Sequence, residues 1–116
     1  QLGRRGEELA ARCLSEEGYE IVRRNWRCPA GEVDIVARQG ETLILVEVRA
    51  RSGPAFGRPE ESIAPAKRAR LIACGAYLVA EMDWRGPWRI DVIAIEMGAG
   101  DAAPRRITHI PNAVEG

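Results

Sequence analysis

The sequence predicts an α/β domain whose mixed sheet is flanked by helices, with its elements in the order α-β-β-β-α-β. Two segments, 2–17 and 65–82, have the apolar spacing of helices, and runs rich in β-branched residues lie between and after them. In the run 42–50, the residues that point to each of the two faces of a strand are largely apolar, which is typical of a central strand that is covered on both faces. A length of 116 residues and a hydrophobic content of 46% are those of one soluble globular domain, so a single domain is expected over 1–116.

The first half of the chain is expected to form a helix and two strands. Over 2–17 the apolar residues fall within one arc of a helical wheel, and Gly18 ends the pattern. Tyr19–Trp26 and Glu32–Arg38 contain the aromatic and β-branched residues of strands. The pair Gln39-Gly40 is the expected turn into the next strand.

The second half begins with the central strand, expected over Thr42–Ala50. Glycines and prolines over Arg51–Ala64 indicate a loop. Pro65 suits the first position of a helix, which is expected to reach Met82. Trp88–Glu96 is predicted as a fourth strand, again apolar on both faces, and Arg106–Ile110 is a candidate for a short last strand.

Composition excludes several classes of protein. Seventeen Lys and Arg residues balance seventeen Asp and Glu residues, so bulk charge argues against a polybasic nucleic-acid binder. No apolar run approaches the roughly 18–20 residues of a membrane span, and we recognise no secretory signal, so no membrane partner is expected. Three cysteines without C-x-x-C spacing favour a reducing compartment over a disulfide framework or a zinc site, which predicts a cytoplasmic protein.

Two acidic residues stand in strands that are otherwise apolar. Asp34 alternates with apolar residues, and acids are costly to bury, so it is either a site residue or an edge acid paired with an Arg. Glu47 follows the apolar run of the central strand and shares a strand face with Arg49, because the side-chain period of a strand is two. A surface ion pair is the alternative interpretation of these two residues.

The length of the turn decides whether the two acids meet. A two-residue loop at Gln39-Gly40 places Glu47 diagonal to Asp34 on one face, and a four-residue loop places them directly opposite each other. A three-residue loop puts them on opposite faces, and the site then does not exist. In either same-face register the carboxylates lie within about 8 Å and repel each other, so they require a hard divalent cation such as Mg²⁺ or the neighbouring Arg49.

A third acid lies in the first helix. Glu7 borders the apolar arc of the wheel and is expected to reach inward toward the sheet, whereas Glu8 lies on the far side and is expected to be solvated. A solvated position is the alternative for Glu7 as well.

A basic cluster surrounds the start of the second helix. Lys67, Arg68 and Arg70 lie in its first turns, and Arg51 precedes them. The helix dipole is already positive at this end, so the arrangement favours a docked anion such as a phosphate. A solvated helix face is the alternative.

Taken together, these features resemble the bacterial YraN family, which is largely uncharacterised and is classed with Holliday-junction-resolvase-like proteins of the PD-(D/E)xK nuclease superfamily. The resemblance covers nearly the whole chain and rests on the order and spacing of several motifs. The motifs are Gly6-Glu7, Asn25, Gly31-Glu32-Val33-Asp34-Ile35-Val36, Val46-Glu47-Val48-Arg49-Ala50-Arg51, Phe56-Gly57, Lys67 with Arg70-Leu71, Arg89-Ile90-Asp91-Val92 and Ile110-Pro111-Asn112-Ala113.

The resemblance implies a restriction-endonuclease-like core and an endonuclease that hydrolyses branched or structured DNA with Mg²⁺ or Mn²⁺. It implies Asp34 and Glu47 as metal ligands and Glu7 as a supporting acid, with the metal activating a water and stabilising the charged phosphate. Resolvases that cut two strands symmetrically act as dimers, so a homodimer is expected by analogy.

The chain departs from the family pattern at Arg49, where the family has Lys. Arg stays protonated and cannot act as a general base, although it can orient a water or steady a phosphate. This departure argues against cleavage but not against binding. Two alternatives therefore stay open: a nucleic-acid-binding module that has lost cleavage, and a protein-interaction domain that reuses the fold. The sequence also leaves open whether Lys67, the only Lys, takes the place of the motif Lys.

Two other titratable residues are expected to have structural roles. Asp91 is interpreted as a partner of Arg89 or as an edge residue, rather than as a metal ligand. His109, the only His, is interpreted as a structural or surface residue, with pH sensing as the alternative.

Overall fold

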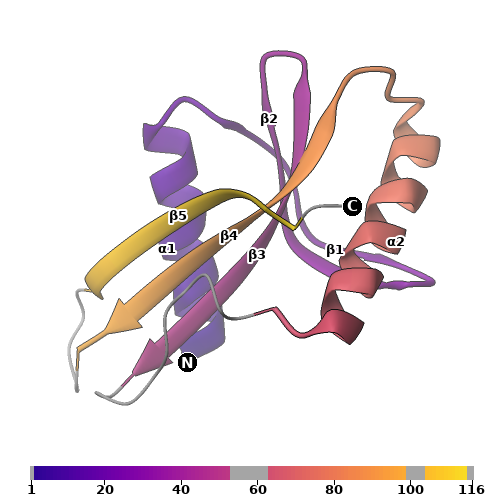
Figure 1. Ribbon diagram of the computed structural model, residues 1–116. Helices are drawn as coiled ribbons and strands as arrows, with labels where there is room; N and C mark the ends of the chain where they lie inside the picture. Colours follow the sequence, from indigo (N-terminus) through magenta and orange to yellow (C-terminus); the bar gives the residue numbers. More distant parts are fainter. Residues whose placement is uncertain (1, 53–62, 99–103, 115–116) are drawn as a thin grey trace.

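Five strands and two helices follow one another in the order α-β-β-β-α-β-β in the computed structural model, which describes residues 2–52, 63–98 and 104–114 (Figure 1). The elements are α1 (Leu2–Glu16), β1 (Glu20–Cys28), β2 (Gly31–Gln39), β3 (Thr42–Ser52), α2 (Pro65–Met82), β4 (Trp88–Met97) and β5 (Pro104–Val114). This arrangement is consistent with a restriction-endonuclease-like core, and it confirms the predicted α/β class with a mixed sheet and flanking helices.

The strands form one sheet in chain order, β1-β2-β3-β4-β5. β1, β2 and β3 pair antiparallel, and β4 pairs antiparallel with β5. β3 and β4 are parallel, so the chain must cross from the end of one to the start of the other, and α2 lies in this crossover. Neither α1 nor α2, the helices of the described residues, is long and apolar enough to cross a membrane.

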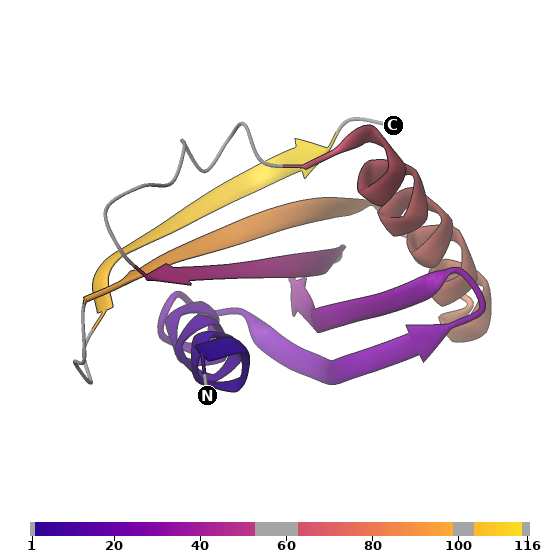
Figure 2. The same ribbon diagram turned by 90° about the horizontal axis from the view of Figure 1, so that it is seen from below.

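β3 is covered on both faces, as its sequence predicts. Leu43 and Leu45 are fully buried in a cluster with residues of α2, and Ile44 and Val46 are fully buried in a second cluster with residues of α1. Alternate residues of a strand point to opposite faces, so each helix covers one face of β3. In Figure 2, α1 lies below the sheet and α2 lies at its right-hand side.

Two glycines allow the helices to approach the sheet closely. A Cβ atom at Gly6 would lie 2.7 Å from the Cβ atom of Ala50, so α1 contacts the late part of β3 where no larger side chain fits. A Cβ atom at Gly75 would overlap the ring of Trp88, so α2 packs against the start of β4 in the same way. These contacts fix both helices relative to the central strand.

Most element boundaries differ by one or more residues from the sequence prediction, and three of these differences have a clear cause in the strand pairing. The turn is Gly40-Glu41 rather than Gln39-Gly40, because Gln39 still pairs with Thr42 and Gly40 takes the positive φ of 61° that a tight turn needs. β3 continues to Ser52 because β4 pairs with it that far, and β5 is longer than the short strand predicted because β4 pairs along its length. Most of the predicted loop Arg51–Ala64, with Phe56-Gly57, lies outside the described residues.

Candidate functional site

The two strand acids lie where β2 and β3 separate. The pairing of the hairpin runs from Gln39 opposite Thr42 to Ile35 opposite Val46, and the same register places Asp34 opposite Glu47. The observed register is therefore the one in which Asp34 and Glu47 are directly opposite each other on the same face. Beyond this point β3 stays paired with β4, so the end of the hairpin is open on the β2 side.

Asp34 is held by the backbone of the opposite strand. The N–H of Val48 donates a 2.8 Å hydrogen bond to Oδ2 of Asp34. Burial raises the pKa of Asp34 to about 7, with further raising by the charges of Glu47 and Glu7, although the Val48 hydrogen bond and the charge of Lys67 act in the opposite direction. A carboxyl in this condition has a high affinity for a proton or for another positive charge.

Glu47 is buried and paired with a lysine of the other half of the fold. Its side chain is only 6% exposed, and one of its oxygens forms an ion pair with Nζ of Lys67, near the start of α2. A buried carboxylate is stable only with such a partner. The pair also explains why α2 tolerates a cation near the positive end of its dipole, since Glu47 compensates the charge.

Glu7 reaches the same place from α1. It lies next to Gly6, where α1 contacts Ala50 of β3, and Nδ2 of Asn25 donates a 2.9 Å hydrogen bond to its Oε1. Asn25 lies on β1 across from Asp34, between two paired positions, with a left-handed φ of 50°. Glu8, by contrast, is exposed, as expected for the solvated side of the helix.

These side chains surround one hollow of about 290 Å³. Its lining combines three acids with three cations and a few neighbours: Gly3, Glu7, Asp34, Glu47, Val48, Arg49, Ala50, Arg51 and Lys67. The sequence placed Arg49 on the face of Glu47, and the structure brings both to this hollow. Arg68 and Arg70 are exposed on α2 and are not part of the lining.

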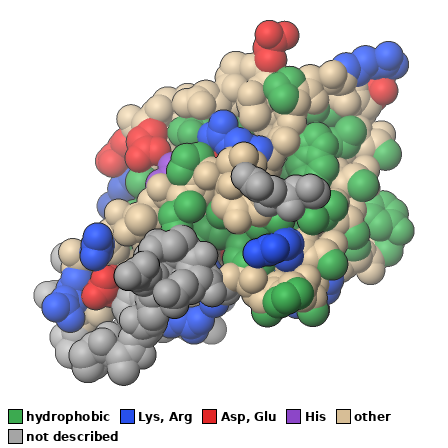
Figure 3. Space-filling model, viewed as in Figure 1, with side chains coloured by type: hydrophobic (Ala, Val, Ile, Leu, Met, Phe, Trp, Pro, Cys, Tyr) green, Lys and Arg blue, Asp and Glu red, His purple; other side chains and the backbone are tan. Residues whose placement is uncertain are grey.

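The basic residues do not form a single surface on the face shown in Figure 3. The Lys and Arg side chains seen there stand in separate groups, between acidic and apolar side chains. This distribution agrees with the zero formal net charge of the chain. On the face shown, the charges of the two signs are therefore interspersed, and no uniformly basic area is seen there.

The oxygen atoms at the hollow fit a divalent cation of the Mg²⁺ type. Among the described residues no group of three or more His, Cys, Asp or Glu side chains is placed to hold a metal, so a closed protein cage is not formed there. Mg²⁺ is commonly held by one or two carboxylates and completes its shell with water and phosphate oxygens. Asp34 and Glu47 are a pair of carboxylates of this kind, and burial, followed by the charges of Glu47 and Glu7, raises the pKa of Asp34.

Sequence reasoning gave no role to two groups of this site. The Val48 N–H could not be predicted from the sequence, because every residue except proline has a backbone N–H and the sequence does not show which one will bind Asp34. Asn25 did carry a signal, since Asn is unusual inside a strand and is one of the residues that tolerates a left-handed backbone. Lys67 was expected to contact nucleic acid, and its ion pair with Glu47 depends on how α2 packs.

A second polar cluster lies away from the hollow and has a structural character. Asp91 is fully buried and accepts hydrogen bonds from Nε of Arg89 at 2.9 Å and from the N–H of Asn112 at 2.8 Å. Nε2 of His109 lies 2.7 Å from Asp91, and Nδ1 lies 3.2 Å from Glu17. The predicted pairing of Asp91 with Arg89 is confirmed, and His109 contacts both Asp91 and Glu17.

The chain has close relatives among proteins known by sequence. A model of the uncharacterised protein family UPF0102 matches residues 6–95. A UPF0102 protein of Roseiflexus castenholzii is 52% identical over 99% of this chain and 94% of its own length. A UPF0102 protein of Beutenbergia cavernae is 48% identical over 94% and 92%, and one of Anaeromyxobacter dehalogenans is 43% identical over 99% and 84%.

Proposed function

The chain belongs to the uncharacterised protein family UPF0102, and from this premise and the geometry of the hollow we propose that it is a Mg²⁺- or Mn²⁺-dependent endonuclease that acts on branched or structured DNA. One observation carries the proposal: Asp34, Glu47 and Lys67, from three different elements, converge on one hollow. The reaction type is inferred from the resemblance to the YraN family, which implies phosphodiester hydrolysis for this combination of residues.

In this proposal Asp34 and Glu47 hold the metal. The cation supplies an activated water and charge stabilisation of the phosphate when it is bound. The Val48 N–H keeps Oδ2 of Asp34 in place, so Oδ1 would be the atom available to hold a metal. Glu7, itself oriented by Asn25, orients a water from the α1 side.

Lys67 takes the part of the lysine that the motif lacks at position 49. Its ammonium group is at the carboxylate of Glu47, which is where a lysine two residues further along β3 would also reach. In the nuclease it positions the attacking water and donates to a phosphate oxygen. Arg49 lines the hollow and binds phosphate, because a guanidinium stays charged and presents several donors.

The remaining cations extend the surface for DNA. Arg51 lines the hollow, and Arg68 and Arg70 lie exposed on the helix that carries Lys67. Contacts of this kind are made to phosphates, so they contribute affinity that falls with salt and carry little sequence information. Symmetric cutting of two strands requires two active sites, and we therefore include a homodimer in the proposal.

The test is cleavage of a labelled four-way DNA junction in Mg²⁺ or Mn²⁺, with a linear duplex of the same sequence as the comparison substrate. Wild type is expected to cut the junction, and chelation of the metal or the substitution Asp34→Asn is expected to abolish cutting. Cutting that persists in Asp34→Asn would mean a contaminating nuclease or a different site.

Arg49 in place of the motif Lys favours a second function, a DNA-binding module that does not cut. It predicts retention of the junction in a gel-shift assay without cleavage in any divalent metal. Failure of both binding and cleavage would leave the protein-interaction alternative.

A further inference from the structure

Two cysteines that are distant in the sequence meet outside the hollow. Cys28 ends β1, Cys74 lies in the middle of α2, and their Sγ atoms are 3.4 Å apart. Both are free thiols in this structure. Residues 46 positions apart thus have their sulfur atoms in contact, so a small approach of the two side chains would bring them to the bond length of a disulfide, about 2.05 Å.

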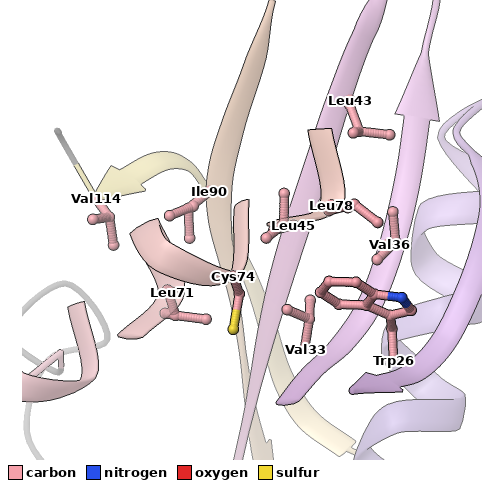
Figure 4. Close-up of a cluster of buried hydrophobic side chains, with 10 residues drawn as sticks. All are labelled: Trp26, Val33, Val36, Leu43, Leu45, Leu71, Cys74, Leu78, Ile90 and Val114. Atoms are coloured by element: carbon pink, nitrogen blue, oxygen red, sulfur yellow. The ribbon is translucent and has the colours of Figure 1, made fainter. Parts of the chain in front are cut away.

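The two thiols differ in their surroundings. Cys74 is 1% exposed and lies in the apolar cluster beneath α2, beside Leu71 and Val33 (Figure 4). Burial and the contact with Cys28 raise the pKa of Cys74 to about 12. Cys28 is half-buried and lines an open hollow of about 350 Å³ formed by residues 27–32. A small oxidant is therefore expected to react first with Cys28, and Cys74 would then be the resolving thiol.

We propose that Cys28 and Cys74 are a redox-modification site, at which a peroxide converts the two thiols to a reversible disulfide between β1 and α2. The Cys28 thiolate attacks an oxygen of the peroxide, the O–O bond breaks, and Cys28 becomes a sulfenic acid, while the hydroxide that leaves takes up the proton lost by the Cys28 thiol and becomes water. Sγ of Cys74 then attacks Sγ of Cys28, the S–O bond breaks, and the hydroxide leaves as water with the Cys74 proton. In total, two thiols and one hydrogen peroxide give one disulfide and two waters.

The disulfide would add a covalent link between β1 and α2, which are also connected by the ion pair of Arg23 with Glu81. β1 leads into β2, and α2 crosses from β3 to β4, so the bond closes a long loop of the chain. Closing such a loop restricts the unfolded chain and stabilises the folded state. The inference does not depend on nuclease activity, because it concerns only the thiols and the stability of the fold.

Cys13 provides an internal control. It lies half-buried on α1, where its Sγ is 3.5 Å from a carboxylate oxygen of Glu17, and burial together with that carboxylate raises its pKa. Its Sγ contacts an acid rather than a thiol, so Cys13 should not take part in the internal disulfide. The variant Cys13→Ser is therefore expected to behave as wild type.

The experiment treats the purified full chain with increasing hydrogen peroxide and follows intact mass and tryptic peptides. The expected result is the loss of two hydrogen atoms per molecule and a peptide that links Cys28 to Cys74, both reversed by dithiothreitol, in wild type and in Cys13→Ser. The oxidised protein should melt at least about 5 °C higher than the reduced protein. Cys28→Ser should show neither change.

Other products would overturn the inference. These are stable addition of oxygen atoms to Cys28 without a linked peptide, disulfides between two molecules, or a linkage that includes Cys13. Because the decisive measurement is made on wild type, the test does not depend on whether a variant at the buried Cys74 folds. A linked peptide without any rise in melting temperature would contradict the stabilising effect of the bond.

Discussion

Lys67 of α2 forms an ion pair with Glu47 of β3, although the two residues lie on different elements and nothing in the strand pattern connects them. The Glu47 side chain is 6% exposed, whereas the Lys67 side chain that pairs with it is 45% exposed. Lys67 also lines the hollow, so in the proposal a phosphate or a water can reach it there. This relationship gives the proposed nuclease the lysine that position 49 lacks.

Replacing Lys67 with Met tests this relationship. The variant leaves Glu47 buried without its cation, so we expect a loss of about 1–3 kcal/mol in the free energy of unfolding. Cleavage is expected to fall by at least about 100-fold, the usual contribution of a group that moves or holds a proton. Arg68→Met, which removes an exposed charge from the same turn, is the matched control for urea unfolding and junction cleavage. Equal losses in the two variants would show that only the helix charge matters.

Moving the lysine to β3 is a second test. Arg49→Lys alone is expected to raise cleavage, because Lys is a compact donor whose pKa falls on burial, unlike that of Arg. In the background of Lys67→Met, the same change should restore part of the lost activity, since residues 47 and 49 share a strand face. Rates of the four proteins form a double-mutant cycle. A double variant as inactive as Lys67→Met would rule out exchange between the two positions.

The carboxyl of Asp34 makes stability depend on pH. Its pKa is raised from 3.8 to about 7, so the folded state binds the proton more tightly and wild type loses stability as pH rises through this window. Asp34→Asn removes the effect and should be more stable than wild type above pH 7, by on the order of 1–2 kcal/mol after allowance for solvent screening. Thermal unfolding from pH 4 to 8 measures the difference, which should grow with pH. A constant difference would contradict the raised pKa.

Mg²⁺ should act on the same carboxyl. A bound cation favours the ionised form, so at pH 8 added Mg²⁺ is expected to raise the melting temperature of wild type. Asp34→Asn should show little response. An equal rise in both proteins would mean that the metal binds elsewhere.

His109 gives a second, separable dependence on pH. Its hydrogen bond to Asp91 raises the pKa of the imidazole from 6.5, with a further contribution from Glu17. The stabilisation is fully present below pH 6.5 and is lost as pH rises through the folded pKa. His109→Gln should lose on the order of 1–2 kcal/mol near pH 5.5 and less at high pH. Chemical unfolding of both proteins at several pH values isolates this residue, since Asp34 is unchanged in each.

The packing of α1 against β3 is tested at two glycines of the same helix. Gly6→Ala forces a Cβ into contact with Ala50 and should cost about 1–3 kcal/mol, and it should lower cleavage by displacing Glu7. A Cβ at Gly3 meets nothing within 4 Å, so Gly3→Ala should be neutral or gain up to about 1 kcal/mol from helix propensity. Urea unfolding measures both, and a neutral Gly6→Ala would mean that α1 lies further from the sheet.

The sequence by itself determined the elements and the faces of the strands. The extent of α2 from Pro65 to Met82 and the double-sided burial of Leu43 to Val46 follow from periodicity and from a proline at a helix start. These features are local, because the period of a helix or a strand acts within a few residues. The same period gave the shared face of Glu47 and Arg49.

Only the tertiary structure decided which side chains meet. Whether Asp34 and Glu47 lie on the same face of the sheet depends on the turn at Gly40-Glu41. One residue more or less in that turn would move one of the two side chains to the opposite face. The ion pair of Lys67 with Glu47 and the contact of Cys28 with Cys74 depend on where α2 packs across the sheet. That position is set by shape, such as the fit of Trp88 against Gly75, which no periodicity within one segment records.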